Sequence, residues 1–311
     1  MATKAKAPRR DVEAEITARV IEALEGGTVP WSKPWTAAGL LPTSFSTGRA
    51  YRGINVWLLS MTAAAKGYGS PYWLTYRQAE EHGGNVRKGE KGTLVVFWKI
   101  LKVADKDPAA KKDATKNVPL MRHYVVFNLE QTENVAVPPR FAPVEQPEPP
   151  SIDEAVGEVL AGYVDGPSLR HVISDRAYYS PSDDAITLPE QAQFATGAGY
   201  ASTLFHELTH STGHPSRLDR FVRDGEPQHF GSEKYAREEL VAEMGAAMLG
   251  AITGVDTQTD QNAAYVANWL GALKGDKSLV VSAAQKAQKA VDRIMPVAAT
   301  EAGDGGQEQA A

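Results

Sequence analysis

The chain has 311 residues, of which 42% are hydrophobic, and no cysteine; it is long enough for two domains with apolar cores, and it excludes disulfides, thiolate nucleophiles and cysteine-bound zinc. The net charge of −5 hides an asymmetry, because residues 1–134 hold 20 Lys and Arg against 13 Asp and Glu, whereas residues 135–311 hold 13 against 25. No apolar run of about 18 residues is present, so we expect no transmembrane helix, no membrane partner and a cytoplasmic location.

The basic part of the chain, residues 1–136, is expected to form a small α+β domain with an antiparallel sheet. The spacing of apolar residues predicts a helix over residues 11–25, and two further helices are expected over residues 53–66 and 75–82. Runs of β-branched and aromatic residues predict two strands, over residues 92–103 and 123–129. The Lys, Asp and Ala-rich segment between them, residues 104–118, is expected to be a flexible insertion.

Basic and aromatic residues cluster in this first domain, where five of the six tryptophans lie within the first hundred residues. Cations contact phosphates and aromatic rings stack on any base, so the composition favours single-stranded DNA as the partner. Trp57 and Trp73 could equally be core residues, and Lys88 and Lys91 could merely solvate a hairpin. The candidate nucleic-acid-binding residues are Arg49, Tyr51, Arg52, Asn55, Trp57, Trp73, Tyr76, Arg87, Lys88 and Lys91.

A proline-rich segment separates the two parts. Residues 137–150 contain six prolines and predict an extended linker. A second domain is expected over residues 151–296, and a disordered tail over residues 297–311. Its predicted helices cover residues 152–163, 199–213, 232–251, 260–273 and 278–294. Its predicted strands cover residues 171–174 and 185–188, on either side of a turn at 179–184.

The strongest chemical signal is the pattern His206-Glu207-Leu208-Thr209-His210. Residues four apart share one face of a helix, so both imidazoles can bind one cation, and Glu207 beside them can take a proton from a bound water. The alternative is a polar helix surface without a metal, but Leu204, Phe205 and Leu208 make this helix mostly apolar.

Two histidines leave a zinc ion short of a third protein ligand. We assign Glu239 in the later helix as that ligand and Glu243 as an acceptor for a ligand-histidine N–H, although the two could exchange roles. Glu238 is expected to face solvent. The expected ion is Zn2+, with Mn2+ or Co2+ as alternatives. Candidates for stabilising a substrate oxyanion are Tyr178, Tyr179, His214 and His229.

Long motifs in both halves carry a family resemblance. They are GRAYRGINVWLL (48–59), YWLTYRQAEEHGGNVRKGEKG (72–92), HYVVFNLEQTE (123–133), YYSPSDDAITLP (178–189), YASTLFHELTHSTGHPSRLDR (200–220), YAREELVAEMGAAML (235–249) and YVANWLGALKGDK (265–277). With them, the chain resembles the ArdC-type antirestriction proteins of conjugative plasmids, which also occur in phage polyvalent proteins. One departure is Ser211-Thr212, where the family commonly has Trp-Thr, so an aromatic ring near the metal is lost.

This resemblance implies an α+β fold in which a single-stranded DNA-binding domain is followed by a zincin-like metallopeptidase domain. It implies His206 and His210 as ligands, Glu207 as the catalytic glutamate, and an acidic ligand from the EELVAE segment. The expected function is protection of incoming plasmid or phage DNA from host restriction, with a host protein as the substrate of a zinc metallopeptidase. The alternatives are a non-catalytic DNA-binding protein with a structural metal, and a general intracellular metallopeptidase.

Overall fold

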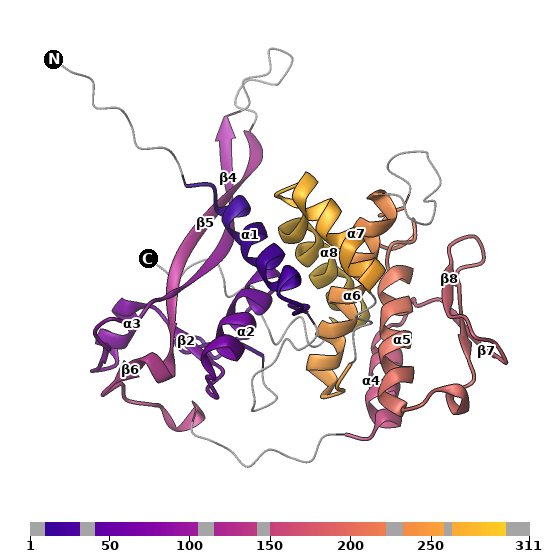
Figure 1. Cartoon of the computed structure of the whole chain (residues 1–311), viewed down its shortest axis with the longest axis horizontal. Coiled ribbons are helices and arrows are strands. Elements are labelled where there is room, and N and C mark those ends of the chain that lie inside the picture. The colour runs from indigo at the N-terminus through magenta and orange to yellow at the C-terminus, as the bar shows by residue number, and fades with distance from the viewer. Residues whose placement is uncertain are drawn as a thin grey trace.

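The structure, a computed structural model, describes residues 10–31, 41–104, 115–141, 150–221, 233–257 and 263–296. The centre of the predicted insertion, most of the predicted linker and the predicted tail lie outside these residues. A layer of helices stands between a long two-stranded ribbon on one side and a small sheet on the other (Figure 1). No helix in the described ranges has both the length and the apolar character that crossing a membrane requires.

The first part is built on a twisted hairpin. Its helices are α1 (Val12–Glu25), α2 (Ile54–Lys66) and α3 (Tyr76–Glu81), close to the three predicted ranges. Its strands are β1 (Thr43–Ser44), β2 (Tyr72–Leu74), β3 (Asn85–Val86), β4 (Thr93–Ala104), β5 (Thr115–Asn128) and β6 (Thr132–Glu133). One sheet has the order β1-β2-β5-β4, and β3 pairs with β6. Because β5 begins at Thr115, residues 115–118 are strand rather than flexible insertion.

The second part has five helices and a three-stranded sheet among the described residues. The helices are α4 (Ile152–Gly162), α5 (Gly197–Ser211), α6 (Glu233–Thr253), α7 (Ala263–Gly275) and α8 (Leu279–Ile294). The strands are β7 (Ser168–Val172), β8 (Tyr178–Ser180) and β9 (Ala185–Pro189), in the order β7-β9-β8. Two strand predictions were therefore wrong in detail: β7 starts and ends earlier than predicted, and Tyr178–Ser180 pairs with β9 instead of forming a turn.

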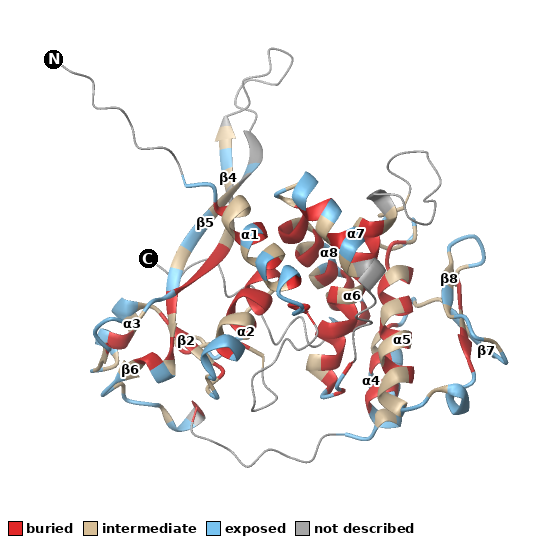
Figure 2. Ribbon diagram, in the orientation of Figure 1, coloured by how far each residue is buried: buried red, intermediate tan, exposed pale blue. Residues whose placement is uncertain are grey.

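The two parts share one core. A single cluster of buried residues runs from α1, α2 and β4 into α4 through α8 (Figure 2). The rings of Trp31 and Trp269 meet edge to face with centroids 5.2 Å apart, and Thr17 Oγ1 donates a 2.6 Å hydrogen bond to the carbonyl of Lys277. Helix α1 therefore packs against α7 and α8, far from it in sequence, and removing either part would expose apolar surface of the other.

Three predicted nucleic-acid-binding residues are buried inside the protein, and those predictions were wrong. Trp57 and Trp73 are 0% exposed, so no base can stack on their rings. Asn55 is also buried, because its side chain donates to the carbonyl of Val96 at 2.7 Å and accepts from the Val96 N–H at 2.8 Å. Val96 lies in β4, which ends its sheet, so Asn55 satisfies backbone groups that lack a neighbouring strand.

The start of the predicted linker is packed on the first part. Residues Pro139–Phe141 form a short 3-10 helix, and the Phe141 ring lies 5.0 Å from that of Phe45 and 4.7 Å from that of Tyr72. Phe141 thus closes a small apolar cluster with Phe45 and Leu74. An aromatic residue inside a proline-rich stretch is therefore used as an anchor, which the proline count alone does not reveal.

Candidate metal centre

Helix α5 presents the two histidines because its other face is apolar. Thr196 caps the helix, its Oγ1 accepting from the Gly199 N–H. Leu204, Phe205 and Leu208 are buried in the core, which turns His206 and His210 together toward α6.

Close contact between α5 and α6 depends on a glycine. A Cβ added to Gly245 of α6 would stand 2.4 Å from Thr209 Cγ2 and 2.6 Å from Thr209 Oγ1. Thr209 is fully buried and β-branched, and its hydroxyl already donates to the carbonyl of Phe205, so it has little freedom to move. The next two residues of α6, Ala246 and Ala247, are also small and buried, but the tight contact is made at Gly245.

We predict that Gly245→Ala separates the two helices and weakens both folding and metal binding. Overpacking of this kind costs about 1–3 kcal/mol, more than the roughly 1 kcal/mol that alanine gains in a helix. The matched control is Gly271→Ala in α7, where an added Cβ meets nothing within 4 Å. Urea unfolding with and without zinc measures both variants; a Gly245→Ala protein as stable as wild type would contradict the prediction.

Three side chains converge at the face of α5 that meets α6. The Nε2 atoms of His206 and His210 are 3.0 Å apart. Glu239 Oε2 lies 3.5 Å from His206 Nε2, and Glu239 Oε1 lies 3.3 Å from His210 Nε2. Ligand atoms of these three residues all lie within 4.8 Å of one another.

This geometry fits a zinc-type ion. Ligands about 2.0–2.1 Å from a tetrahedral centre are about 3.3 Å from each other, close to the separations found here. Two imidazoles and one carboxylate are also the donor set of zinc peptidase sites that keep a fourth position open. The residues present therefore suit the ion that the sequence predicts.

The electrostatics of the cluster favour a cation. Burial lowers the pKa of His206, but the carboxylates of Glu239 and Glu243 outweigh it and hold that pKa well above its ordinary value. Burial likewise lowers the pKa of His210, and Glu238 and Glu239 raise it to about 9. Burial raises the pKa of Glu239, yet the two histidines hold it below its usual range. Positive charge is thus strongly stabilised here, and an entering metal ion must displace protons.

The remaining members of the acidic cluster flank the histidines. Glu243 Oε1 lies 3.4 Å from His206 Nδ1. Glu238 was expected to face solvent, and that prediction was wrong: it is 7% exposed, forms an ion pair with Arg220 and lies 3.5 Å from His210 Nδ1. Glu207 is 8% exposed, and within the described part of the chain its carboxylate has no hydrogen-bond or ion-pair partner. Both of its carboxylate oxygens therefore remain available as hydrogen-bond acceptors.

Among the described residues, none of the candidate oxyanion residues has a hydrogen bond or ring contact with His206 or His210. Tyr179 donates to Asp184 at 2.8 Å and accepts from Arg217, a buried residue that also donates to the carbonyl of Ser211 at the end of α5. His214 bonds locally to Ser216, Tyr178 is half exposed, and His229 lies outside the described residues. Tyr179 therefore anchors the end of α5 to the sheet.

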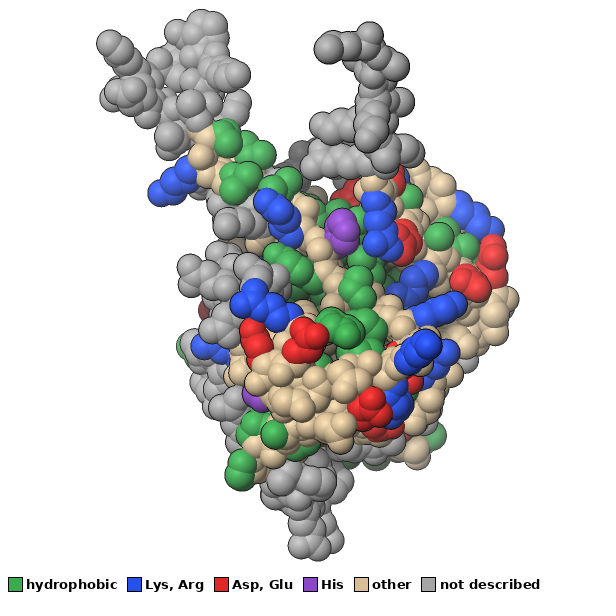
Figure 3. Space-filling view, turned by 90° about the vertical axis from the view of Figure 1, so that its left-hand side faces the viewer, with side chains coloured by type: hydrophobic (Ala, Val, Ile, Leu, Met, Phe, Trp, Pro, Cys, Tyr) green, Lys and Arg blue, Asp and Glu red, His purple; other side chains and the backbone are tan. Residues whose placement is uncertain are grey.

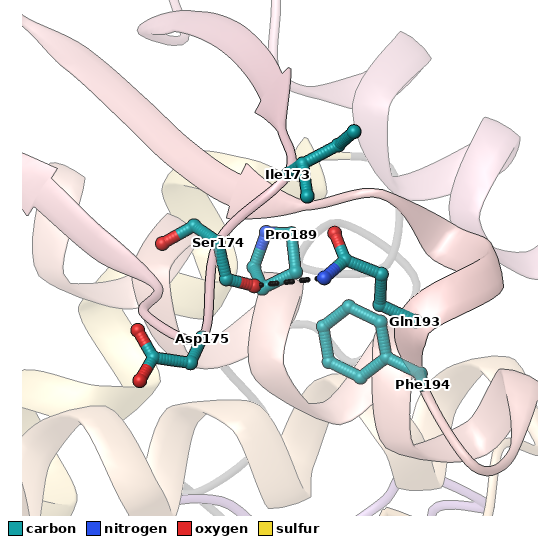
Figure 4. A pocket seen from close by; sticks show the side chains of 6 residues that line it. All are labelled: Ile173, Ser174, Asp175, Pro189, Gln193 and Phe194. Atoms are coloured by element: carbon teal, nitrogen blue, oxygen red, sulfur yellow. Dashed lines mark hydrogen bonds between the residues drawn. The ribbon is translucent and has the colours of Figure 1, made fainter.

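An open hollow lies at the far end of the small sheet (Figure 4). It is lined by Ile173, Ser174, Asp175, Pro189, Gln193 and Phe194, and Gln193 Nε2 donates to the carbonyl of Ser174 at 3.1 Å. No histidine or glutamate of the acidic cluster lines it. The hollow is thus separate from the site formed by His206, His210 and Glu239.

The remaining predicted nucleic-acid-binding residues lie at the surface of the first part or close to it. Arg49, Tyr76, Arg87, Lys88 and Lys91 are exposed. Tyr51 and Arg52 are half buried, and Arg52 forms an ion pair with Asp292 of α8. On the face shown in Figure 3, hydrophobic side chains gather in the centre, and Lys and Arg lie around them together with several Asp and Glu.

Comparison with known families divides the chain into two matches. Residues 10–127 match the N-terminal domain of anti-restriction factor ArdC. Residues 164–286 match a zincin-like metallopeptidase. These matches bear out the predicted α+β organisation, in which a zincin-like domain follows a different N-terminal domain.

Two solved structures are similar over nearly the whole chain. The metal-free crystal structure of the antirestriction ArdC protein from plasmid R388 covers 94% of this chain and 99% of its own, with 43% identity and a TM-score of 0.75. The Mn(II)-bound structure of that protein covers 95% of this chain and 100% of its own, with 41% identity and a TM-score of 0.74.

Curated relatives include much longer proteins. A DNA primase TraC of Escherichia coli is 38% identical over 92% of this chain but only 27% of its own length. Another TraC primase from the same species is 36% identical over 93% of this chain and 20% of its own. The uncharacterized protein y4eC of Sinorhizobium fredii (strain NBRC 101917 / NGR234) is 35% identical over 91% of each chain.

Proposed function

Since this chain belongs to the ArdC family of antirestriction proteins, we propose that it binds single-stranded DNA through its first part and carries a metal-dependent peptidase site in its second. The proposed peptidase site is supported by the convergence of His206, His210 and Glu239, whose ligand atoms lie within 4.8 Å of one another. Glu207 lies on the same helix as the two histidines. Together these activities protect incoming plasmid or phage DNA from host restriction.

In this proposal His206, His210 and Glu239 hold a zinc-type ion, with Mn2+ or Co2+ as alternatives. The ion, when bound, acidifies a water molecule and polarises a substrate carbonyl. Glu207 would take a proton from a water bound there and pass it to the leaving amine, because it directly follows the ligand His206 on α5 and pairs with no arginine or lysine among the described residues. A structural metal would need no such base, which favours catalysis over the structural alternative. We propose a host protein as the substrate.

For the DNA surface, we propose stacking rings other than the buried tryptophans. Tyr51, Phe97 and Tyr124 form a row on one face of the β4–β5 ribbon, with centroid distances of 6.4 Å and 5.5 Å. All three residues are half buried, and burial raises the pKa of the Tyr51 hydroxyl, so we propose Phe97 and Tyr124 as the rings that contact a base. Arg122 is directly opposite Phe97 in the ribbon register and is exposed. Opposite residues of an antiparallel pair share a face, so this guanidinium lies beside the rings, where it suits a phosphate.

We predict that binding of the full chain to an oligothymidylate weakens steeply as salt increases. Each phosphate that a cation neutralises contributes about −0.7 to the slope of log K against log salt for single strands. Alanine at both Lys88 and Lys91 should flatten that slope, measured by fluorescence anisotropy. The control removes Lys286 and Lys289, exposed lysines on α8 of the acidic part. The full chain is required because the first part shares its core with α7 and α8. If the affinity of wild type did not change with salt concentration, the proposed electrostatic contact with DNA would be refuted.

A further inference from the structure

A buried ion pair, between Glu238 and Arg220, lies next to Nδ1 of His210, whereas Nε2 of the same ring faces His206. We propose that Glu238 and Arg220 form a positioning pair that orients His210 toward the metal and prevents Glu238 from becoming a ligand itself. The inference rests on the proposed metal site, and it assigns a role to two residues that do not contact the ion. Neither residue belongs to the His-Glu-x-x-His pattern or to the Glu239 and Glu243 pair.

The first observation is the contact between Glu238 and the imidazole. Glu238 Oε1 lies 3.5 Å from His210 Nδ1, while the other ring nitrogen, Nε2, lies 3.3 Å from Glu239 Oε1. Successive residues of a helix point about 100° apart, so neighbouring carboxylates of α6 reach opposite nitrogens of one ring. A proton on Nδ1 directed at Glu238 leaves the Nε2 lone pair for the metal.

The second observation is the way Arg220 holds that carboxylate. Its Nη2 donates to Glu238 Oε1 at 2.7 Å, and its Nε lies 3.1 Å from Glu238 Oε2, so the guanidinium grips both oxygens. Arg220 also donates to Thr212 Oγ1 at 2.6 Å and to the carbonyl of Thr209 at 2.8 Å, which fixes it to the end of α5. The side chains of Arg220 and Glu238 are only 7% and 9% exposed.

The consequence follows from charge. A buried carboxylate next to a metal site would otherwise be drawn to the ion and fill the position that a catalytic water needs. With both oxygens bonded to a guanidinium, Glu238 remains an acceptor for His210 Nδ1. The corresponding acceptor for His206 is Glu243, at 3.4 Å, and no Arg or Lys within the described ranges pairs with it. The arginine therefore controls one histidine specifically.

A merely structural role, in which the pair ties residues 212–220 to α6, is the competing explanation. Two variants of the full chain separate them. Glu238→Ala removes the acceptor but leaves Arg220 buried and unpaired, which could unfold the protein. The double variant Arg220→Met with Glu238→Leu replaces the pair by apolar side chains of similar size, which folded proteins often tolerate well. Circular dichroism identifies the folded variants.

The test is the zinc dissociation constant, measured by competition with a chromophoric chelator. We expect folded Glu238→Ala and the folded double variant to bind zinc about 10- to 100-fold more weakly than wild type. The control is Asp184→Asn, which weakens the ion pair of another buried arginine at the same end of α5, Arg217, and Asp184 has no contact with His206 or His210 among the described residues. It should change zinc affinity less than about threefold.

The outcomes are distinct. A folded double variant that loses less than about tenfold in zinc affinity would overturn the positioning role, because a structural pair is replaceable by good packing. An equal loss in Asp184→Asn would also overturn it, since the effect would then be general loosening of α5. If wild type itself bound no zinc, the proposed metal centre would fail before this inference was reached.

Discussion

Alanine in place of His206 or His210 is expected to reduce bound zinc from about one ion per chain to none after gel filtration. Each substitution removes one of three protein ligands that lie within 4.8 Å of one another, and two ligands hold zinc too weakly to survive separation. Elemental analysis of the purified protein measures the loss. Zinc should also raise the unfolding temperature of wild type and leave that of the variants unchanged, because only a ligand that binds the native state stabilises it.

The matched control for this experiment is His171→Ala. His171 lies in β7 of the same part of the chain and bonds only to the hydroxyl of Tyr200 among the described residues, at 3.0 Å. It should keep its zinc. Full zinc occupancy in His206→Ala would mean that the ion is held elsewhere, and the assignment of all three ligands would have to be abandoned.

Glu207→Gln is expected to keep its zinc and lose peptidase turnover by a factor of about 10²–10⁴, the usual contribution of a general base. Glutamine has the size of glutamate but cannot accept a proton, and Glu207 has no hydrogen-bond partner in the described part of the chain that the change would disturb. The readout is a proteomic comparison of host proteins cleaved in cells that express wild type or the variant. Glu158→Gln, an exposed glutamate of α4, serves as the control.

A parallel assay of restriction protection separates the functions. If Glu207→Gln abolishes both cleavage and protection, the peptidase site acts in antirestriction. If cleavage products are absent from wild type as well and protection is intact in the variant, the protein acts by covering DNA, and the metal is structural. Protection that survives while cleavage is lost would assign the two activities to separate tasks.

The sequence predicted the positions of the helices well, and α5 shows how apolar residues at the helical period made this possible. Leu204, Phe205 and Leu208 define the buried face of α5, and the histidines follow on the other side by geometry alone. The same reasoning placed Glu239 next to them, because an acid at the right position of a neighbouring helix is all that a third ligand requires. The spacing of residues along one helix was sufficient to predict which of its side chains are buried and which are available to a ligand.

The errors arose where the outcome depended on a partner distant in sequence. The residues around Glu238 in the sequence do not indicate that Arg220, 18 residues earlier, forms an ion pair with it. An exposed position was therefore the reasonable expectation. Trp57 and Trp73 have the residue type that nucleic-acid surfaces favour, and only the packing of α2 and β2 decides that both are core. The strand Tyr178–Ser180 was missed because turn-forming residues follow it immediately and its partner, β9, comes later.

The shared interior of the two parts restricts how this sequence can be reused in evolution. Because Trp31 of the first part is capped by Trp269 of the last, a gene fusion that inherited only one half would inherit an unsatisfied apolar face. A longer protein that acquires the N-terminal part therefore keeps that apolar surface covered if it acquires the zincin-like part as well, whether or not the chemistry of the second part is needed. Retention of a peptidase-type fold beside an unrelated activity would then reflect architecture as much as selection for cleavage.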